Sequence, residues 1–159
     1  MTYPTSWNLA RYFYTGLDDS RLADDIADIL PETAKFRAKY EKSFPKFTTP
    51  EEILEFYTDY TDFSYRLGKP SYYLFYRSSL DTQDLDVTKK MGEIDYISTE
   101  ASNQLLFVAQ GWKEIGYDRI MTWSRDPKLV KYRNDLVGTA EGIKHILGER
   151  EEYVLNMKS

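Results

Sequence analysis

The sequence contains no cysteine and a single histidine, His145. Without cysteine the chain cannot form a disulfide framework, a thiolate nucleophile or a thiolate metal site, and this composition suits a reducing cytoplasm. A zinc site needs three or four ligands of the His, Cys or carboxylate kind, so this chain alone cannot build a histidine-based metal centre. A di-iron bundle, which uses two Glu-x-x-His motifs, is excluded for the same reason.

Long apolar runs are also missing. No stretch approaches the roughly 20 apolar residues that cross a bilayer, and the N-terminus lacks the charged start and apolar run of a signal peptide. The eight glycines are spread out, and none makes the spacing of a phosphate-binding loop. The 26 acidic and 21 basic residues give a net charge of -5, with no basic patch. We therefore expect a cytoplasmic protein that binds neither nucleic acid nor a membrane.

What the chain does contain is helical periodicity. Its 159 residues are about the size of one domain, and 42% of them are apolar. The apolar residues recur at steps of three, four and seven, and no segment shows the alternating, β-branched pattern of strands. The sequence therefore predicts an all-α fold, an antiparallel helical bundle or hairpin array of about five helices, forming a single domain over residues 1–159.

Local signals place these helices along the chain. The first helix is expected to carry apolar residues from Leu22 to Tyr40, with a kink or a fresh start at Pro31. The clearest start is Thr49-Pro50-Glu51-Glu52, where threonine caps, proline occupies the first helical position and Glu52 reaches back. The helix that follows should end or bend at Gly68-Lys69-Pro70, before the pattern resumes from Tyr72 to Leu80.

The longest predicted helix is central, running from about Asp84 to Ile115 and ending at Gly116, which favours a left-handed cap. About 30 residues of this pattern correspond to a rod of about 45 Å. Asp126-Pro127 repeats the cap-then-proline start and opens a helix that extends to Gly138. Gly148 precedes one last short helix.

None of the reactive side chains forms a convincing catalytic or metal-binding pattern. We interpret His145 as a helix-end residue, where a partial positive charge is favoured, and not as part of a Ser-His-Asp arrangement. The acidic pairs Asp18-Asp19, Asp24-Asp25 and Glu51-Glu52 are interpreted as exposed or first-turn carboxylates and not as metal ligands. We therefore expect no catalytic residue, no metal ligand and no cofactor in this chain.

Aromatic residues are the unusual feature, with 14 Tyr, 8 Phe and 3 Trp. Consecutive aromatic residues on a helix cannot all point inward, so part of such a run faces solvent, a neighbouring domain or a bound chain. We favour an intramolecular interface over ligand contact, and the sequence leaves both open. The candidate residues for an interface or a peptide groove are Tyr72, Tyr73, Phe75 and Tyr76.

An ordered set of motifs over essentially all 159 residues resembles the N-terminal part of the oligoendopeptidase F family of zinc metallopeptidases, within the thimet oligopeptidase-like clan. Each motif is common alone, and the specificity lies in the order and spacing. The motifs are Trp7-x-Leu9-x-x-Tyr12, Ala23-Asp24-Asp25-Ile26, Phe36-x-x-x-Tyr40, Tyr65-Arg66-Leu67, Leu80-Asp81-Thr82-Gln83-Asp84, Asp126-Pro127-x-Leu129-x-x-Tyr132-Arg133 and Glu149-x-Glu151-Glu152-x-Val154-Leu155-x-x-Lys158-Ser159.

The resemblance implies a helical lobe that precedes a mostly helical catalytic domain. In that domain a His-Glu-x-x-His helix and a downstream Glu hold zinc, and the two lobes enclose a channel for short peptides. This chain has no His-Glu-x-x-His, so no catalytic or metal-binding residue of the family is carried over to it. Zinc is expected in the full-length family enzyme, and this chain alone should be inactive.

The leading hypothesis is therefore a non-catalytic N-terminal lobe that shapes the peptide channel and packs on a catalytic zinc-peptidase domain, in the same chain or in another. The rival hypothesis is a stand-alone helical interaction or scaffold module with no role in peptide hydrolysis. An enzyme that uses Tyr, Glu and His145 is the least favoured reading. If the isolated lobe exposes an apolar, Tyr-rich face, we also expect it to self-associate.

Overall fold

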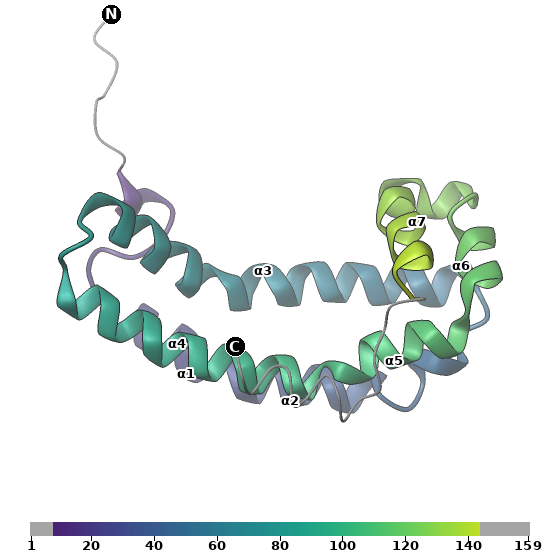
Figure 1. Ribbon diagram of the computed structural model, residues 1–159, viewed down its shortest axis with the longest axis horizontal. Coiled ribbons are helices and arrows are strands. Elements are labelled where there is room, and N and C mark those ends of the chain that lie inside the picture. The colour runs from purple at the N-terminus through teal and green to yellow at the C-terminus, as the bar shows by residue number, and fades with distance from the viewer. Residues whose placement is uncertain (1–7, 144–159) are drawn as a thin grey trace, which may run out of the picture.

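The computed structural model describes residues 8–143, in which helices joined by loops and turns are the regular elements and no strand occurs (Figure 1). The predicted all-α fold is therefore confirmed. The helical array contains three short 3-10 helices besides the α-helices. In chain order the elements are η1 (Leu9–Arg11), α1 (Ser20–Ala27), α2 (Ile29–Tyr40), η2 (Phe44–Lys46), α3 (Pro50–Leu80), α4 (Leu85–Gln104), α5 (Leu106–Ile115), α6 (Tyr117–Trp123), η3 (Pro127–Tyr132) and α7 (Arg133–Gly142).

The longest helix, α3, begins at the predicted capping box. The backbone N–H of Glu52 donates to the Thr49 hydroxyl over 3.3 Å, and the Glu52 carboxylate accepts the N–H of Thr49 over 2.9 Å. The helix continues through Pro70, so the sequence signal at residues 68–70 produces a bend and not an end. A proline inside a helix removes one donor and crowds the preceding turn, which bends a helix that tertiary packing holds together.

The first predicted helix is present as α1 and α2, with only Asp28 between them. Pro31 is the third residue of α2, where the first-turn amides have no partner within the helix. The missing N–H of Pro31 therefore costs no intrahelical hydrogen bond. The predicted fresh start is confirmed, and it explains part of the difference between about five predicted helices and the larger number observed.

The long helix predicted from Asp84 to Ile115 is present as α4 and α5, which only Leu105 separates. Asp84 caps α4, because its carboxylate accepts the N–H groups of Asp86 and Val87 over 3.1 Å each. At Leu105 the backbone N–H bonds the carbonyl of Ser102 over 3.0 Å, a tighter 3-10 pattern that changes the helix direction.

The chain after α5 differs from the prediction. Gly116 ends α5, as expected, but its φ of 84° comes with a ψ of 158°, outside the left-handed helical region predicted for the cap, and α6 follows at once. Asp126 does cap the next element through the N–H of Lys128, yet that element is the 3-10 helix η3. Helix α7 also passes Gly138, because the cost of one glycine, about 1 kcal/mol, does not end a helix that is packed on a core. The helix predicted after Gly148 lies outside the described residues.

Helices α3 and α4 form an antiparallel hairpin, α1 and α2 lie along it, and α5, α6 and α7 gather at the end where α3 begins (Figure 1). Two separate apolar cores fill this array. The first core lies at the α5–α7 end, and its largest buried side chains are aromatic: Phe36, Tyr40, Phe44, Phe56, Tyr57, Phe63, Phe107, Trp112, Trp123 and Tyr132. The second core lies toward the α3–α4 turn and contains Tyr14, Leu22, Ile26, Ile29, Tyr73, Leu74, Ile94 and Ala101.

Close ring packing fixes the first core. The ring of Phe44 stacks on Phe56 with centroids 4.2 Å apart and meets Trp112 edge-on at 4.9 Å. Such pairs add about 0.5–1.5 kcal/mol beyond the area they bury. The Phe44 ring fits against α5 because residue 111 is glycine: a Cβ at Gly111 would lie only 2.4 Å from the Cδ1 atom of Phe44.

Replacing Gly111 by alanine should destabilise the protein by about 1–3 kcal/mol, because the added methyl group displaces the buried Phe44 ring from its stack. Urea unfolding followed by circular dichroism measures this change. Gly138→Ala is the matched control, since nothing lies within 4 Å of the added Cβ in α7. The control should raise stability by about 0.5–1 kcal/mol. Equal stabilisation by both substitutions would contradict the packing argument.

Candidate functional site

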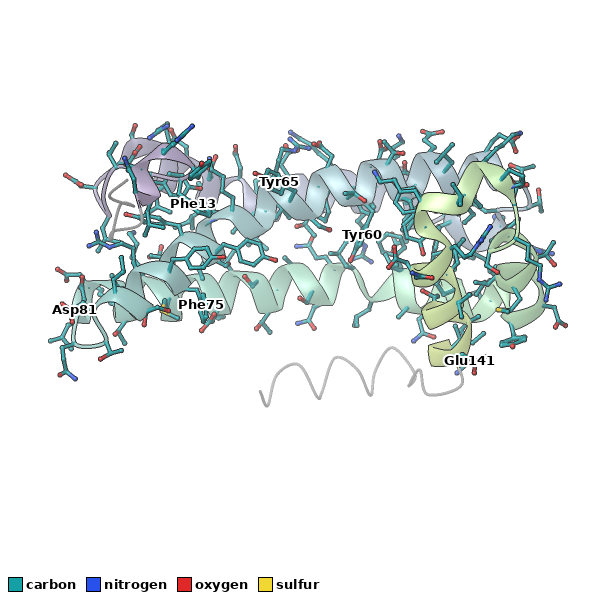
Figure 2. All side chains as sticks on the ribbon, turned by 90° about the horizontal axis from the view of Figure 1, so that it is seen from above. Phe13, Tyr60, Tyr65, Phe75, Asp81 and Glu141 are labelled. Carbon is teal, nitrogen blue, oxygen red and sulfur yellow. The ribbon has the colours of Figure 1, made fainter. Side chains whose placement is uncertain are left out.

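Helix α3 presents aromatic side chains to solvent along its second half. Tyr65 is 72% exposed, and Tyr72 and Phe75 are each 58% exposed. We call these three residues the aromatic face. The ring of Tyr72 lies over Gly68, where a Cβ would come within 3.0 Å of the ring. Figure 2 shows Tyr65 and Phe75 on the same helix, away from the α5–α7 end. Exposed aromatic residues gathered in this way are typical of protein interfaces.

The structure divides the four candidate aromatic residues. Tyr72 and Phe75 are exposed, whereas Tyr73 is 1% exposed and lies in the second core. Tyr73 meets Tyr14 edge-on, with ring centroids 5.1 Å apart. Tyr76 is half-buried and contacts the rings of Phe13 and Phe75, each at 5.8 Å. Consecutive residues point about 100° apart on a helix, so Tyr72 and Tyr73 face different surroundings.

Four exposed tyrosines lie outside the four candidates: Tyr12, Tyr65, Tyr96 and Tyr117. Tyr65 lies seven residues before Tyr72 and therefore on the same side of α3, a spacing that could have identified it. Tyr96 on α4 is 69% exposed. It is an isolated aromatic residue in the sequence, and no local signal marks it.

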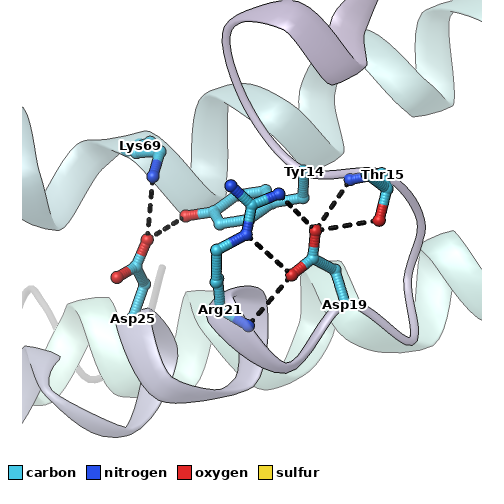
Figure 3. A network of polar contacts seen from close by, with 6 residues as sticks. All are labelled: Tyr14, Thr15, Asp19, Arg21, Asp25 and Lys69. Atoms are coloured by element: carbon cyan, nitrogen blue, oxygen red, sulfur yellow. Dashed lines mark hydrogen bonds and ion pairs between the residues drawn. The ribbon is translucent and has the colours of Figure 1, made fainter.

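Behind the aromatic face, a polar network joins the N-terminal segment, α1 and α3 (Figure 3). The hydroxyl of the buried Tyr14 donates to the Oδ2 atom of Asp25 over 2.6 Å, and the Nζ atom of Lys69 donates to the same oxygen over 3.1 Å. Lys69 also lies 4.6 Å from the centre of the Tyr14 ring, within the range of a cation–π contact. Burial, together with the hydrogen bond to Asp25, raises the pKa of the Tyr14 hydroxyl far above its usual value. The hydroxyl therefore stays protonated and acts as a structural hydrogen-bond donor.

Asp19 anchors the start of α1 beside this network. Its carboxylate accepts the N–H and the hydroxyl of Thr15, over 2.8 and 3.0 Å, and also the backbone N–H of Arg21 over 3.0 Å. The guanidinium of Arg21 adds two further bonds, of 3.0 and 2.6 Å. These bonds, with those from Arg21 first, hold the pKa of the Asp19 carboxyl well below its usual range. The Asp19 carboxylate is therefore engaged in hydrogen bonds within the protein.

A second network joins α2 to α3. The Nζ atom of Lys39 donates to Glu55 over 2.8 Å and to Asp59 over 2.6 Å, and the hydroxyl of Tyr40 donates to Asp59 over 2.6 Å. The bonds from Lys39 and Tyr40 lower the pKa of the Asp59 carboxyl. Burial is the main reason that the pKa of Tyr40 rises to about 12. This network lies beside the first core and stabilises the contact of two helices.

A hollow of about 480 Å³ opens between the junction of α1 with α2 and the middle of α3. Four of its charged residues form two ion pairs: Lys69 with Asp25, and Arg66 with Glu32 at 3.8 Å. With Asp28, the lining holds three carboxylates against two cations, beside the rings of Phe63 and Tyr65. Its lining consists of Asp25, Asp28, Glu32, Phe63, Tyr65, Arg66, Leu67 and Lys69.

No group of three or more His, Asp or Glu side chains between residues 8 and 143 is placed to hold a metal ion. None of the helices in the same range is both long enough and apolar enough to span a membrane. His145 lies outside the described residues. The candidate functional feature of residues 8–143 is the aromatic face.

Comparison with known proteins adds no family assignment, because no family model, no curated protein and no solved structure matches this chain.

Replacing Tyr14 by phenylalanine should lower the free energy of unfolding by about 1 kcal/mol, because Asp25 loses one of its two donors while staying partly hydrated. Urea unfolding measures the change. Tyr12→Phe is the control, since Tyr12 is 69% exposed and its loss of a hydroxyl should leave stability unchanged. A Tyr14→Phe protein as stable as the control would show that the bond contributes nothing.

High pH should destabilise the protein through its buried tyrosines. Burial raises the pKa of Tyr57 to about 12, and Tyr40 titrates at a similar value, against about 10 in an unfolded chain. The folded state therefore keeps these protons longer. The resulting stability is complete below pH 10 and is lost as the pH rises from about 10 to about 12.

Urea midpoints measured between pH 8 and pH 11.5 test this dependence. Tyr57→Phe should flatten the loss, whereas Tyr96→Phe, at an exposed position, should keep the wild-type slope. Full titration of all tyrosines near pH 10 by absorbance at 295 nm, with the fold intact, would contradict the prediction.

Proposed function

We propose that this chain is a non-catalytic helical lobe that docks on a separate domain through the aromatic face, and that this domain is a zinc-peptidase catalytic domain of the oligoendopeptidase F type. The motif order of the sequence supports the identity of the partner. The exposed aromatic residues of α3 support the docking role.

One comparison within α3 carries the docking proposal. Phe75 lies 18 residues after Tyr57, which is about five whole turns, so on a straight helix the two rings would leave on the same side; the bend at residues 68–70 lies between them. Tyr57 is 9% exposed, whereas Phe75 is 58% exposed. Leu54 and Tyr72 have the same spacing, and there too the first is partly buried against the core and the second is exposed.

The difference arises from what covers each half of α3. Tyr57 stacks on Tyr132 of η3 with centroids 4.6 Å apart and packs against Trp112 of α5 at 5.9 Å. Phe75 has a ring contact with Tyr76 of the same helix and stays 58% exposed. A docked domain would cover the second half of α3 as α5 and η3 cover the first.

Docking also gives the lobe a role without chemistry of its own. The catalytic partner supplies the zinc and the reacting groups, and the lobe supplies a wall of aromatic rings beside the hollow between α1, α2 and α3. Tyrosine rings offer apolar area together with a hydroxyl group, which suits contact with peptides of varied sequence.

Affinity capture from the source cells tests the proposal. The wild-type chain used as bait should enrich a protein that contains His-Glu-x-x-His, identified by mass spectrometry. A Tyr72→Ser/Phe75→Ser bait should lose at least about 90% of that protein, because the two substitutions remove the central rings of the interface.

Tyr96→Ser is the matched control bait, because it removes an equally exposed ring from α4 and should capture the partner normally. Circular dichroism should confirm that all three baits are folded. Recovery of a folded wild-type bait without any His-Glu-x-x-His protein would overturn the proposed partner and favour a stand-alone interaction module.

A further inference from the structure

The end of the hairpin, where α3 turns into α4, exposes large apolar side chains. Leu80 ends α3 and is 66% exposed, and Leu85 begins α4 and is 80% exposed. Tyr12, directly after η1, is 69% exposed. Figure 1 shows η1 beside the last turns of α3, and Figure 2 shows Asp81 at the extreme end of the molecule. Several exposed apolar side chains within one small area mark a contact surface.

A pocket of about 240 Å³ lies among these residues, lined by Leu9, Tyr76, Ser79 and Leu80. We call it the end pocket. A cavity of about 150 Å³ with an apolar lining is large enough for benzene, so the end pocket can receive one leucine or one aromatic side chain. Leu85 is the most exposed large apolar residue among those described, and it belongs to the same end of the molecule.

Charges of opposite sign stand close in the sequence to two lining residues of the end pocket. Arg11 is two residues from Leu9, and Asp81 follows Leu80 directly. Neither forms an ion pair within residues 8–143. The guanidinium of Arg11 lies over the ring of Tyr12 at 5.4 Å, and the Asp81 carboxylate accepts only the N–H of Gln83 among the contacts of this part of the chain. Both charges are thus available to a partner.

We propose that the hairpin end binds a second copy of this chain in a two-fold symmetric dimer. The same surface carries an apolar pocket, a protruding leucine, a cation and a carboxylate. A two-fold axis through this surface places Leu85 of each copy at the end pocket of the other. It also exchanges the two charges, so that Arg11 of one copy faces Asp81 of the other. Phe75 of the aromatic face borders this contact, because its ring lies 5.8 Å from the ring of Tyr76 in the pocket lining.

Sedimentation velocity of the full chain at several concentrations measures this association. The contact area at the end of one hairpin is small, so the dimer should be weak, with a Kd of about 1–100 µM. Leu85→Ser should weaken the dimer at least about tenfold, because the side chain that fills the end pocket is lost. Val130→Ser, which changes a 60% exposed residue of η3, should leave association unchanged.

Charge reversal tests the arrangement of the two copies. Arg11→Asp and Asp81→Arg should each be monomeric alone, because each homodimer brings like charges together twice. An equimolar mixture of the two variants should dimerise, because both contacts then pair Asp with Arg. This recovery cannot come from a general change in folding.

Three results would overturn the proposal: a wild-type chain that stays monomeric up to about 1 mM, well above the expected Kd; dimerisation that Leu85→Ser leaves unchanged; or a mixture of the charge-reversed variants that stays monomeric. Dimerisation that is lost in Tyr72→Ser/Phe75→Ser but kept in Leu85→Ser would place self-association on the aromatic face and would equally reject the hairpin end.

Discussion

The structure depends on the burial of α3 in two separate cores. Its first half inserts Ile53, Phe56 and Phe63 among the rings of the first core, and its second half inserts Tyr73 and Leu74 into the second core. Leu67 packs against both cores. A 31-residue helix does not hold one apolar stripe in a fixed direction when it bends, so the partners of α3 change along its length. This change decides which aromatic rings are buried and which remain at the surface.

The polar networks follow from this packing. A carboxylate links each of the helices α1 and α2 to α3. Asp25 of α1 accepts a hydrogen bond from Lys69 of α3. Asp59 of α3 accepts hydrogen bonds from Lys39 and Tyr40 of α2. In both cases a tyrosine hydroxyl at the edge of a core supplies a second hydrogen bond. The charged groups of these two networks are therefore occupied where the helices meet.

The sequence predicts those features that depend on nearest neighbours along the chain. The capping box at Thr49 and Glu52, the fresh start near Pro31 and the glycine end at Gly116 are local, and all three occur as predicted. No comparable sequence signal marks the interruption at Leu105, because leucine is a good helix former. None marks the start of α6 either, because the residue before it, Gly116, predicts the end of a helix. These features arise from packing on the first core.

The candidate aromatic residues, too, depend partly on local sequence and partly on packing against distant segments. The run Tyr72 to Tyr76 predicts that some rings are exposed, because a helix cannot bury every direction at once. Which rings are exposed depends on the elements that lie against α3, and these come from distant parts of the chain. Tyr73 is buried because Tyr14 reaches it from the N-terminal segment. Phe75 is exposed because η3 and α5 cover only the first half of the helix.

The two proposed contacts share a border, and this has a thermodynamic consequence. The rings of Phe75, on the aromatic face, and Tyr76, in the lining of the end pocket, lie 5.8 Å apart. A partner that covers Phe75 therefore changes the surroundings of a residue that a second copy would contact. By linkage, the effect of the docked domain on self-association must equal the effect of self-association on docking. If the proposed domain filled the shared border, docking and self-association would exclude each other.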